Sequence, residues 1–153
     1  IPVPIHFAVV RPEVRVLTRE ARAILPQSVP LRDAVHNASS LAFLVDALRA
    51  GDLMELGRAI EQDRIVEPVR ATLVPCYDAV LGAAREAGSL GAALSGSGPA
   101  MFAVAESADA AEAVCEAMTA AALAAGYHVT GLACGIDPIG ARTTELKAPE
   151  ALY

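Results

Sequence analysis

The sequence predicts an α+β fold: a two-layer sandwich of ferredoxin-like type, in which helices cover a mostly antiparallel sheet. The later half of the chain alternates apolar segments in the order helix, strand, loop, strand, helix, strand. A short loop joins the two middle strands, as between antiparallel neighbours, and an apolar run near the N-terminus adds another strand. We therefore expect four or five strands within one domain of ordinary size.

Composition narrows the possible functions. Of the 153 residues, 54% are hydrophobic but only 4% are aromatic, so the core is aliphatic and a stacking platform for single-stranded nucleic acid is not expected. The net charge of −6 also argues against binding to a nucleic-acid backbone. The dispersed cysteines and histidines form no C-x-x-C or zinc pattern, which predicts reduced thiols, a cytoplasmic protein and no bound metal. No apolar run reaches the ~18 residues of a membrane-spanning helix, so no membrane association is expected.

The first third of the chain predicts a strand and two helices. Residues 5–10 are apolar and lie between prolines, which predicts a strand. The Thr18 hydroxyl is expected to cap a short helix that ends at Pro26. Apolar residues at helical spacing predict a long helix over 30–50. A polar cluster near its middle either lines a site or forms a solvated face, and we favour the solvated face. This cluster consists of His36, Asn37, Ser39 and Ser40.

Three more helices are expected further along the chain. A capping box of aspartate and glutamate opens one over 52–60. Apolar periodicity predicts another over 77–87, followed by a glycine suited to a helix end. An alanine-rich segment over 108–125 predicts the third, with Ser107 as its N-terminal cap.

The remaining segments are shorter. Charged residues alternate with apolar residues and prolines over 63–75, which favours a solvated connection, although its prolines would stiffen the backbone and hold Arg70 at a fixed angle. Residues 127–134 predict a strand and residues 141–146 a short last strand. Residues 148–153 are expected to form a frayed tail.

The stretch Ser95-Gly96-Ser97-Gly98-Pro99 lies between two apolar strands and has more than one interpretation. Glycine adopts positive φ without steric cost and lets another backbone approach closely. The loop supplies exposed N–H groups and hydroxyls without bulk, so it suits a neighbouring phosphate loop or an anionic substrate. It suits a plain tight turn equally well.

Three separate segments resemble motifs of one enzyme family. Residues 95–99 resemble the third motif of the GHMP kinases, the superfamily of galactokinase, homoserine kinase, mevalonate kinase and phosphomevalonate kinase. Residues 18–26 and 63–70 resemble the T-x-E-A-R-x-I-L-P and D-x-I-x-E-P-x-R segments of bacterial homoserine kinases. The resemblance identifies residues 1–147 as a GHMP kinase C-terminal domain.

The resemblance implies a reaction and a set of site residues. Homoserine kinases transfer the γ-phosphoryl group of MgATP to the hydroxyl of L-homoserine, giving O-phospho-L-homoserine for threonine synthesis. In the family, the arginines that match Arg22 and Arg70 hold the substrate carboxylate, for which a bidentate guanidinium is well suited. Thr18 belongs to the same environment. No catalytic base and no metal ligand are assigned. The loop residues expected to support the ATP phosphate loop are Ser95, Gly96, Ser97 and Gly98.

The resemblance also implies partners. The family's phosphate loop and acidic Mg²⁺ ligand lie in an N-terminal ATP-binding domain that this sequence does not contain. We therefore expect ATP and Mg²⁺ to serve the intact enzyme, whereas this chain alone binds neither and is inactive. The expected partners are L-homoserine and the N-terminal domain, and the alanine-rich helices allow a homodimer.

Two other functions remain open at this point. The chain could belong to a different GHMP small-molecule kinase, whose substrate would not require the Arg22 and Arg70 pair if it lacked an α-carboxylate. It could also be a non-enzymatic ferredoxin-like domain of ACT type that binds an amino acid. Binding of homoserine or threonine by the isolated chain would favour that domain.

Overall fold

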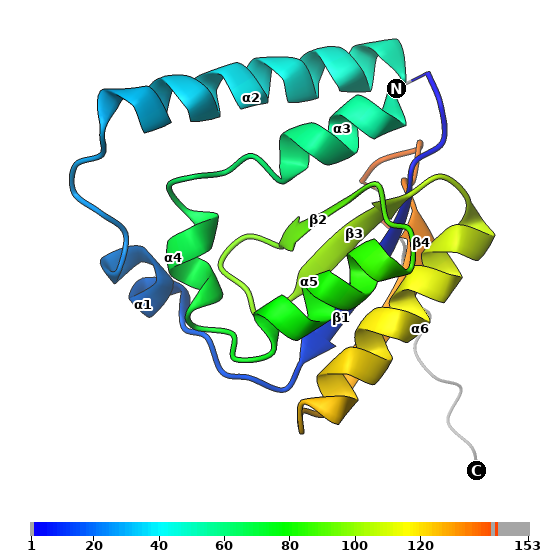
Figure 1. Cartoon of the computed structure of the whole chain (residues 1–153). Coiled ribbons are helices and arrows are strands. Elements are labelled where there is room, and N and C mark those ends of the chain that lie inside the picture. The colour runs from blue at the N-terminus through cyan, green and yellow to red at the C-terminus, as the bar shows by residue number, and fades with distance from the viewer. Residues whose placement is uncertain (1, 142, 144–153) are drawn as a thin grey trace.

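The computed structural model describes residues 2–141 and 143 and confirms the α+β fold. Within them, four strands form one sheet in the order β2-β3-β1-β4, with every neighbouring pair antiparallel (Figure 1). The strands are β1 (His6–Pro12), β2 (Gly91–Leu94), β3 (Met101–Ala105) and β4 (Val129–Gly135). The helices are α1 (Thr18–Ala23), α2 (Leu31–Ala50), α3 (Leu53–Ile60), α4 (Glu67–Ala71), α5 (Tyr77–Glu86) and α6 (Ala108–Ala124). This strand order is ferredoxin-like and leaves β2 at one edge of the sheet.

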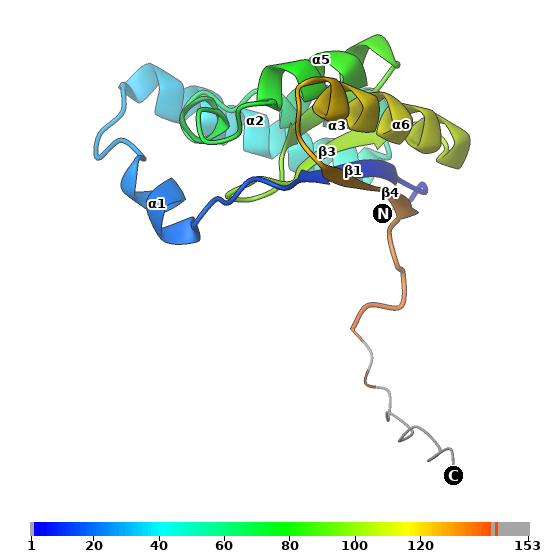
Figure 2. The ribbon, with the colours of Figure 1, turned by 90° about the horizontal axis from the view of Figure 1, so that it is seen from below.

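Helices α5 and α6 cover one face of the sheet and enclose the main core (Figure 2). Strand residues that alternate onto this face pair across the register, as Val10 does with Met101. Each fully buried aliphatic side chain contributes about 1.5–3 kcal/mol of hydrophobic stabilisation. The large side chains that are fully buried here include Leu81, Met101, Val114 and Met118.

Helix α3 packs along the β2 side of the sheet, and α2 packs against α3 (Figure 1). Ala47 and Leu56 join Ile5 and Val104 in a second, smaller buried cluster. The rings of Phe7 and Phe102 meet edge to face beside it, with centroids 6.1 Å apart. The two clusters together hold the α3–α5 region against β2, and this region carries the candidate site described below.

The two faces of α2 differ from the sequence-based expectation. His36 Nε2 lies 3.1 Å from the Gln62 carbonyl oxygen, and Asn37 Nδ2 donates to Asp63 Oδ1 at 2.7 Å. The prediction of a solvated polar face is therefore wrong for Asn37, whose bond to Asp63 is partly buried, because the connection after α3 offers polar groups on that side. Several apolar side chains of α2 are exposed instead: Leu31 (79%), Val35 (56%), Leu41 (62%) and Val45 (49%).

Two predicted helix caps are confirmed by their hydrogen bonds. Asp52 Oδ1 accepts from the Glu55 amide at 2.9 Å at the start of α3. Ser107 Oγ accepts from the Ala110 amide at 3.1 Å at the start of α6. Such a cap satisfies an amide that the helix itself leaves unpaired, at a gain of about 1 kcal/mol.

The last predicted segments fall largely outside the described residues. Strand β4 confirms the strand expected over 127–134. Of the short strand expected over 141–146, only residues 141 and 143 are described and neither is in a strand, and the tail over 148–153 lies outside. The three cysteines are free thiols, with Cys76 and Cys115 buried. No helix in the described part of the chain is both long and apolar enough to cross a membrane.

Candidate functional site

The loop between β2 and β3 is a closed turn built around two glycines. Gly96 has a φ of 63° and Gly98 a φ of 78°, in the left-handed region that glycine adopts without strain. The Gly98 amide donates to the Ser95 carbonyl oxygen at 3.1 Å, and the Ser95 amide donates to the Ala100 carbonyl oxygen at 2.8 Å. The Ser97 hydroxyl donates to the Gly98 carbonyl oxygen at 3.3 Å. The turn therefore holds its own shape and leaves Ser95 and Gly96 exposed at its tip.

Arg70 connects this loop to two helices. It stands near the end of α4, and its Nη1 donates to the Gly96 carbonyl oxygen at 3.0 Å. Its Nε donates to the Ala21 carbonyl oxygen of α1 at 3.3 Å. The guanidinium thereby joins three segments that are distant in sequence. Its remaining N–H donors, including both on Nη2, have no partner among the described residues.

Thr18 and Arg22 of α1 are exposed, and Arg22 follows Ala21, whose carbonyl oxygen accepts from Arg70. The prediction that Thr18 caps this helix is wrong, because the N-cap position belongs to Leu17, which has no polar side chain. Within the described part of the chain, neither Thr18 nor Arg22 forms a side-chain hydrogen bond or ion pair. Arg70 therefore contacts the loop directly. Arg22 is linked to Arg70 only because its neighbour, Ala21, accepts a hydrogen bond from the Arg70 side chain.

Asp63 organises the segment that was expected to be a solvated connection. Its Oδ1 accepts from the amides of Ile65 (2.8 Å) and Val66 (3.0 Å), and its Oδ2 accepts from the Glu67 amide (2.9 Å). The Glu67 amide is the first of α4 and the other two precede it, so Asp63 holds the entry to a helix that sequence reasoning missed. The signal was present: a proline in the first turn, at Pro68, is typical of a helix start.

Glu67 is a second residue that sequence reasoning missed. Its Oε1 accepts from the Leu94 amide and from the Tyr77 hydroxyl, both at 2.8 Å. Leu94 is the last residue of β2, so this bond pairs an amide on the open edge of the sheet. Glu61 Oε1 accepts in the same way from the amide of Ala92, which lies two residues before Leu94 on β2, at 3.1 Å. Two carboxylates therefore occupy the place of a neighbouring strand along β2.

A family model described as "GHMP kinases C terminal" matches residues 44–124, which is more than half of the chain. The chain belongs to the GHMP kinases. The match begins within α2 and ends with α6, so it includes α4, the β2–β3 loop and Arg70.

Individual GHMP kinases resemble the chain over most of its length. It is 44% identical to a homoserine kinase of Thermococcus kodakarensis over 88% of this chain and 46% of that protein. It is 39% identical to one of Arabidopsis thaliana over 90% of this chain and 38% of that protein. A crystal structure of a homoserine kinase from Cytophaga hutchinsonii superposes with a TM-score of 0.83 and 37% identity, over 87% of this chain and 42% of that one. The chain spans less than half the length of these relatives.

The pKa values of Asp63, Glu67 and Tyr77 in this GHMP kinase domain are shifted from their ordinary values. Burial alone would raise the pKa of Asp63, but its hydrogen bonds outweigh burial and lower the pKa. Burial raises the pKa of Glu67, and the bonds from Tyr77 and the Leu94 amide offset this only in part. Burial and the neighbouring Glu67 carboxylate raise the pKa of the Tyr77 hydroxyl, which therefore stays a proton donor.

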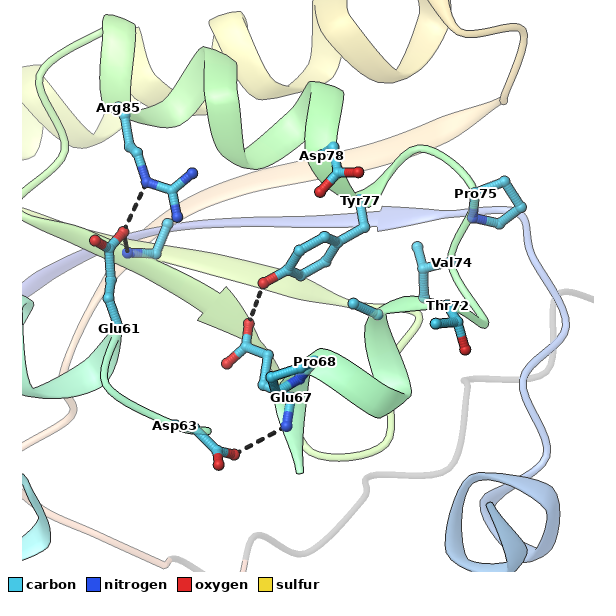
Figure 3. A pocket seen from close by; sticks show the side chains of 12 residues that line it. Glu61, Asp63, Glu67, Pro68, Thr72, Val74, Pro75, Tyr77, Asp78 and Arg85 are labelled. Atoms are coloured by element: carbon cyan, nitrogen blue, oxygen red, sulfur yellow. Dashed lines mark hydrogen bonds and ion pairs between the residues drawn. The ribbon is translucent and has the colours of Figure 1, made fainter. Parts of the chain in front are cut away.

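A cavity of about 500 Å³ opens between the β2 edge, α4 and α5 (Figure 3). Its acidic lining is largely engaged with protein donors: Glu61 Oε1 also accepts from Arg85 Nε at 3.0 Å, and Glu67 is held by Tyr77. Among residues 2–141 and 143, no group of three or more histidine, cysteine, aspartate or glutamate side chains is arranged to hold a metal ion. These carboxylates thus hold the edge of the sheet and the start of α4 in place.

Proposed function

We propose that this chain is the substrate-binding half of a homoserine kinase, which transfers the γ-phosphoryl group of ATP to the hydroxyl of L-homoserine. Homoserine kinases of an archaeon and a plant are 44% and 39% identical to the chain. The observation that carries the proposal is the position of Arg70, held between α1 and the glycine loop with N–H donors to spare. The product is O-phospho-L-homoserine, and the protein acts in the cytoplasm.

Recognition of the amino-acid carboxylate is assigned to α1 and α4. A guanidinium binds a carboxylate in bidentate fashion, and Arg70 is oriented for this by two bonds to backbone oxygens. Arg22 is exposed one residue beyond Ala21, which Arg70 contacts, and Thr18 lies one turn earlier on the same helix. The three side chains would grip the carboxylate and leave the hydroxyl of homoserine directed at the phosphate.

The loop is assigned to the nucleotide side of the site. Phosphoryl transfer depends on positioning and on charge neutralisation more than on covalent chemistry. The relatives are more than twice as long as the aligned part of this chain, which leaves room for an N-terminal domain with an ATP phosphate loop. The loop residues that would support that phosphate loop are Ser95, Gly96, Ser97 and Gly98. Among the described residues, no group of three or more histidine, cysteine, aspartate or glutamate side chains is arranged to hold a metal ion, so the protein ligands of Mg²⁺ are assigned to the N-terminal domain. When bound, Mg²⁺ neutralises phosphate charge.

The test is a phosphotransferase assay on the full-length protein that contains this chain. We expect ATP-dependent phosphorylation of L-homoserine. We expect little with 3-aminopropan-1-ol, which has the same hydroxyl and amine but no carboxylate for Arg22 and Arg70. Mevalonate serves as the alternative substrate, and its preference over homoserine would assign the protein to another branch of the GHMP kinases. Equal rates with homoserine and 3-aminopropan-1-ol would remove the carboxylate from the recognition mechanism.

A second test concerns the chain on its own. Calorimetry of residues 1–147 with MgATP is expected to show no binding, because the proposed phosphate loop belongs to the other half of the enzyme. A micromolar affinity for MgATP would contradict this division of labour. Binding of homoserine or threonine by the isolated chain would instead favour an amino-acid-binding module.

A further inference from the structure

Helix α4 holds the glycine loop at two points. Glu67, its first residue, accepts the amide of Leu94, which directly precedes the loop, at 2.8 Å. Arg70, three residues later, donates to the carbonyl oxygen of Gly96 inside the loop at 3.0 Å. One bond fixes an N–H and the other a C=O, two residues apart on the same stretch of backbone. A single helical turn therefore determines where the loop lies relative to the Arg70 guanidinium.

Glu67 is itself held firmly. The Tyr77 hydroxyl donates to the same oxygen, Oε1, that accepts from Leu94. The amide of Glu67 donates to Asp63 Oδ2 at 2.9 Å, so both the backbone and the side chain of Glu67 are tied (Figure 3). Because both the amide and the carboxylate of Glu67 are hydrogen-bonded, its side chain has few alternative conformations. The position of α4 therefore fixes the position of the loop, as expected of a residue that supports a functional site.

We propose that Glu67 is a positioning residue for phosphoryl transfer, which sets the glycine loop relative to Arg70 without touching substrate. This inference rests on the proposed homoserine kinase function. It assigns a role to the glutamate of the D-x-I-x-E-P-x-R segment. Reacting groups displaced by about 1 Å lose up to about 100-fold in rate, so a loop freed at Leu94 is expected to impair catalysis.

The chain offers a matched control in Glu61. Glu61 also accepts a β2 amide, that of Ala92 at 3.1 Å, and it also lies on the cavity wall. It differs from Glu67 in lying two strand residues further from the loop and in having no helical link to Arg70. Glu61→Ala and Glu67→Ala each remove one carboxylate and one edge hydrogen bond, so a purely structural role would affect both variants alike.

The experiment compares Glu67→Ala, Glu67→Gln and Glu61→Ala in the full-length protein, with kcat and KM for homoserine. We expect Glu67→Ala to lower kcat/KM by about 10- to 100-fold. Glu67→Gln keeps an amide oxygen in place of Oε1 and should stay within about 3-fold of the wild type. Glu61→Ala should also stay within about 3-fold, although its melting temperature falls. Equal kinetic losses in Glu61→Ala and Glu67→Ala, or no loss in Glu67→Ala, would overturn the proposal.

Hydrogen exchange separates a failure of the positioning role from a failure of the proposed function, and a Tyr77 variant covers the case in which Glu67→Ala does not fold. Amide hydrogen exchange should accelerate at Leu94 and across 95–98 in Glu67→Ala but not in Glu61→Ala; unchanged exchange refutes the positioning role whatever the substrate is. A wild type that does not phosphorylate homoserine refutes the proposed function instead. If Glu67→Ala does not fold, Tyr77→Phe replaces it, because it removes the donor that steadies Glu67 and keeps the ring. A kcat/KM unchanged in Tyr77→Phe would then count against the proposal.

Discussion

Gly57 of α3 and Gly91 of β2 bring their backbones into direct contact. A methyl group built on Gly57 would overlap the Leu90 carbonyl, and one built on Gly91 would overlap the backbone of Gly57. Neither position has an unusual φ, so both glycines are required by lack of space and not by backbone conformation. This contact sets the distance between α3 and the edge of the sheet, and with it the reach of Glu61 and Glu67 to β2.

Gly57→Ala is therefore expected to destabilise the domain by about 3 kcal/mol or more, because the opposing atoms belong to backbone that cannot rotate away. Chemical denaturation measures the loss. Gly82→Ala is the matched control, since a methyl group on this α5 glycine meets nothing within 4 Å. That substitution should stabilise by about 0.5–1 kcal/mol through helix propensity. A neutral Gly57→Ala would show that α3 shifts freely over β2.

Arg70→Leu is expected to raise KM for homoserine by about 10- to 100-fold, which corresponds to a loss of about 1.5–3 kcal/mol of binding. Arg70→Lys should recover little, because a lysine cannot donate to Gly96 and Ala21 and still bind a carboxylate in bidentate fashion. Steady-state kinetics of the full-length protein provide the measurement. Arg58→Leu, at an exposed ion pair with Glu55, is the control with unchanged KM. An unchanged KM in Arg70→Leu would exclude Arg70 from the site.

Asp63→Ala is expected to cost about 1–3 kcal/mol of stability at neutral pH, since three amides at the start of α4 lose their acceptor. The folded state lowers the pKa of Asp63, so its contribution is present above the ordinary value of 3.8 and is lost as the pH falls through the folded pKa. The gap between wild type and variant should close in acid, as followed by urea unfolding. Asp46→Ala, on the exposed side of α2, should change stability by less than about 0.5 kcal/mol throughout.

Glu67→Gln tests a pKa shift of opposite sign. Burial raises the pKa of Glu67 above its ordinary value of 4.5, so the folded state binds the proton more tightly than the unfolded state. The contribution of Glu67 to stability therefore falls as the pH rises from 4.5 through the folded pKa. Glutamine does not titrate, so the variant should gain stability relative to the wild type as the pH increases over that window. A variant that loses stability relative to the wild type as the pH rises would mean that the fold favours the ionised carboxylate.

Much of the fold could be predicted because its signals are local. The caps at Asp52 and Ser107, the glycine loop and the apolar strand at residues 91–94 depend on near neighbours in the chain, and the structure confirms them. The predicted N-cap of α1, Thr18, is wrong by one residue: Thr18 already has helical backbone angles, so the N-cap position falls on Leu17. Helix α4 was missed since Asp63, which accepts the amide of its first residue, lies in a segment whose charges and prolines also suit a solvated connection.

The pairing of Glu67 with Leu94 was beyond such reasoning. These residues are 27 positions apart, and their contact requires the β2 edge, α3 and α4 to be assembled first. The same is true of His36 and Asn37, whose polar partners reach α2 only after the chain has turned back beyond α3. The contact of Arg70 with Ala21 and Gly96 spans even more of the chain.

Residue order alone specified the four strands and every helix except α4, and it placed glycine where the loop needs positive φ, because those outcomes depend on torsional freedom and on bonds between near neighbours. Folding in three dimensions decided which backbone groups the charged side chains contact. The Glu67 carboxylate accepts an amide from the edge of the sheet, and Arg70 connects three segments. Both contacts form only when distant segments pack together, because the edge amide and the guanidinium donors have no partner nearby in the sequence.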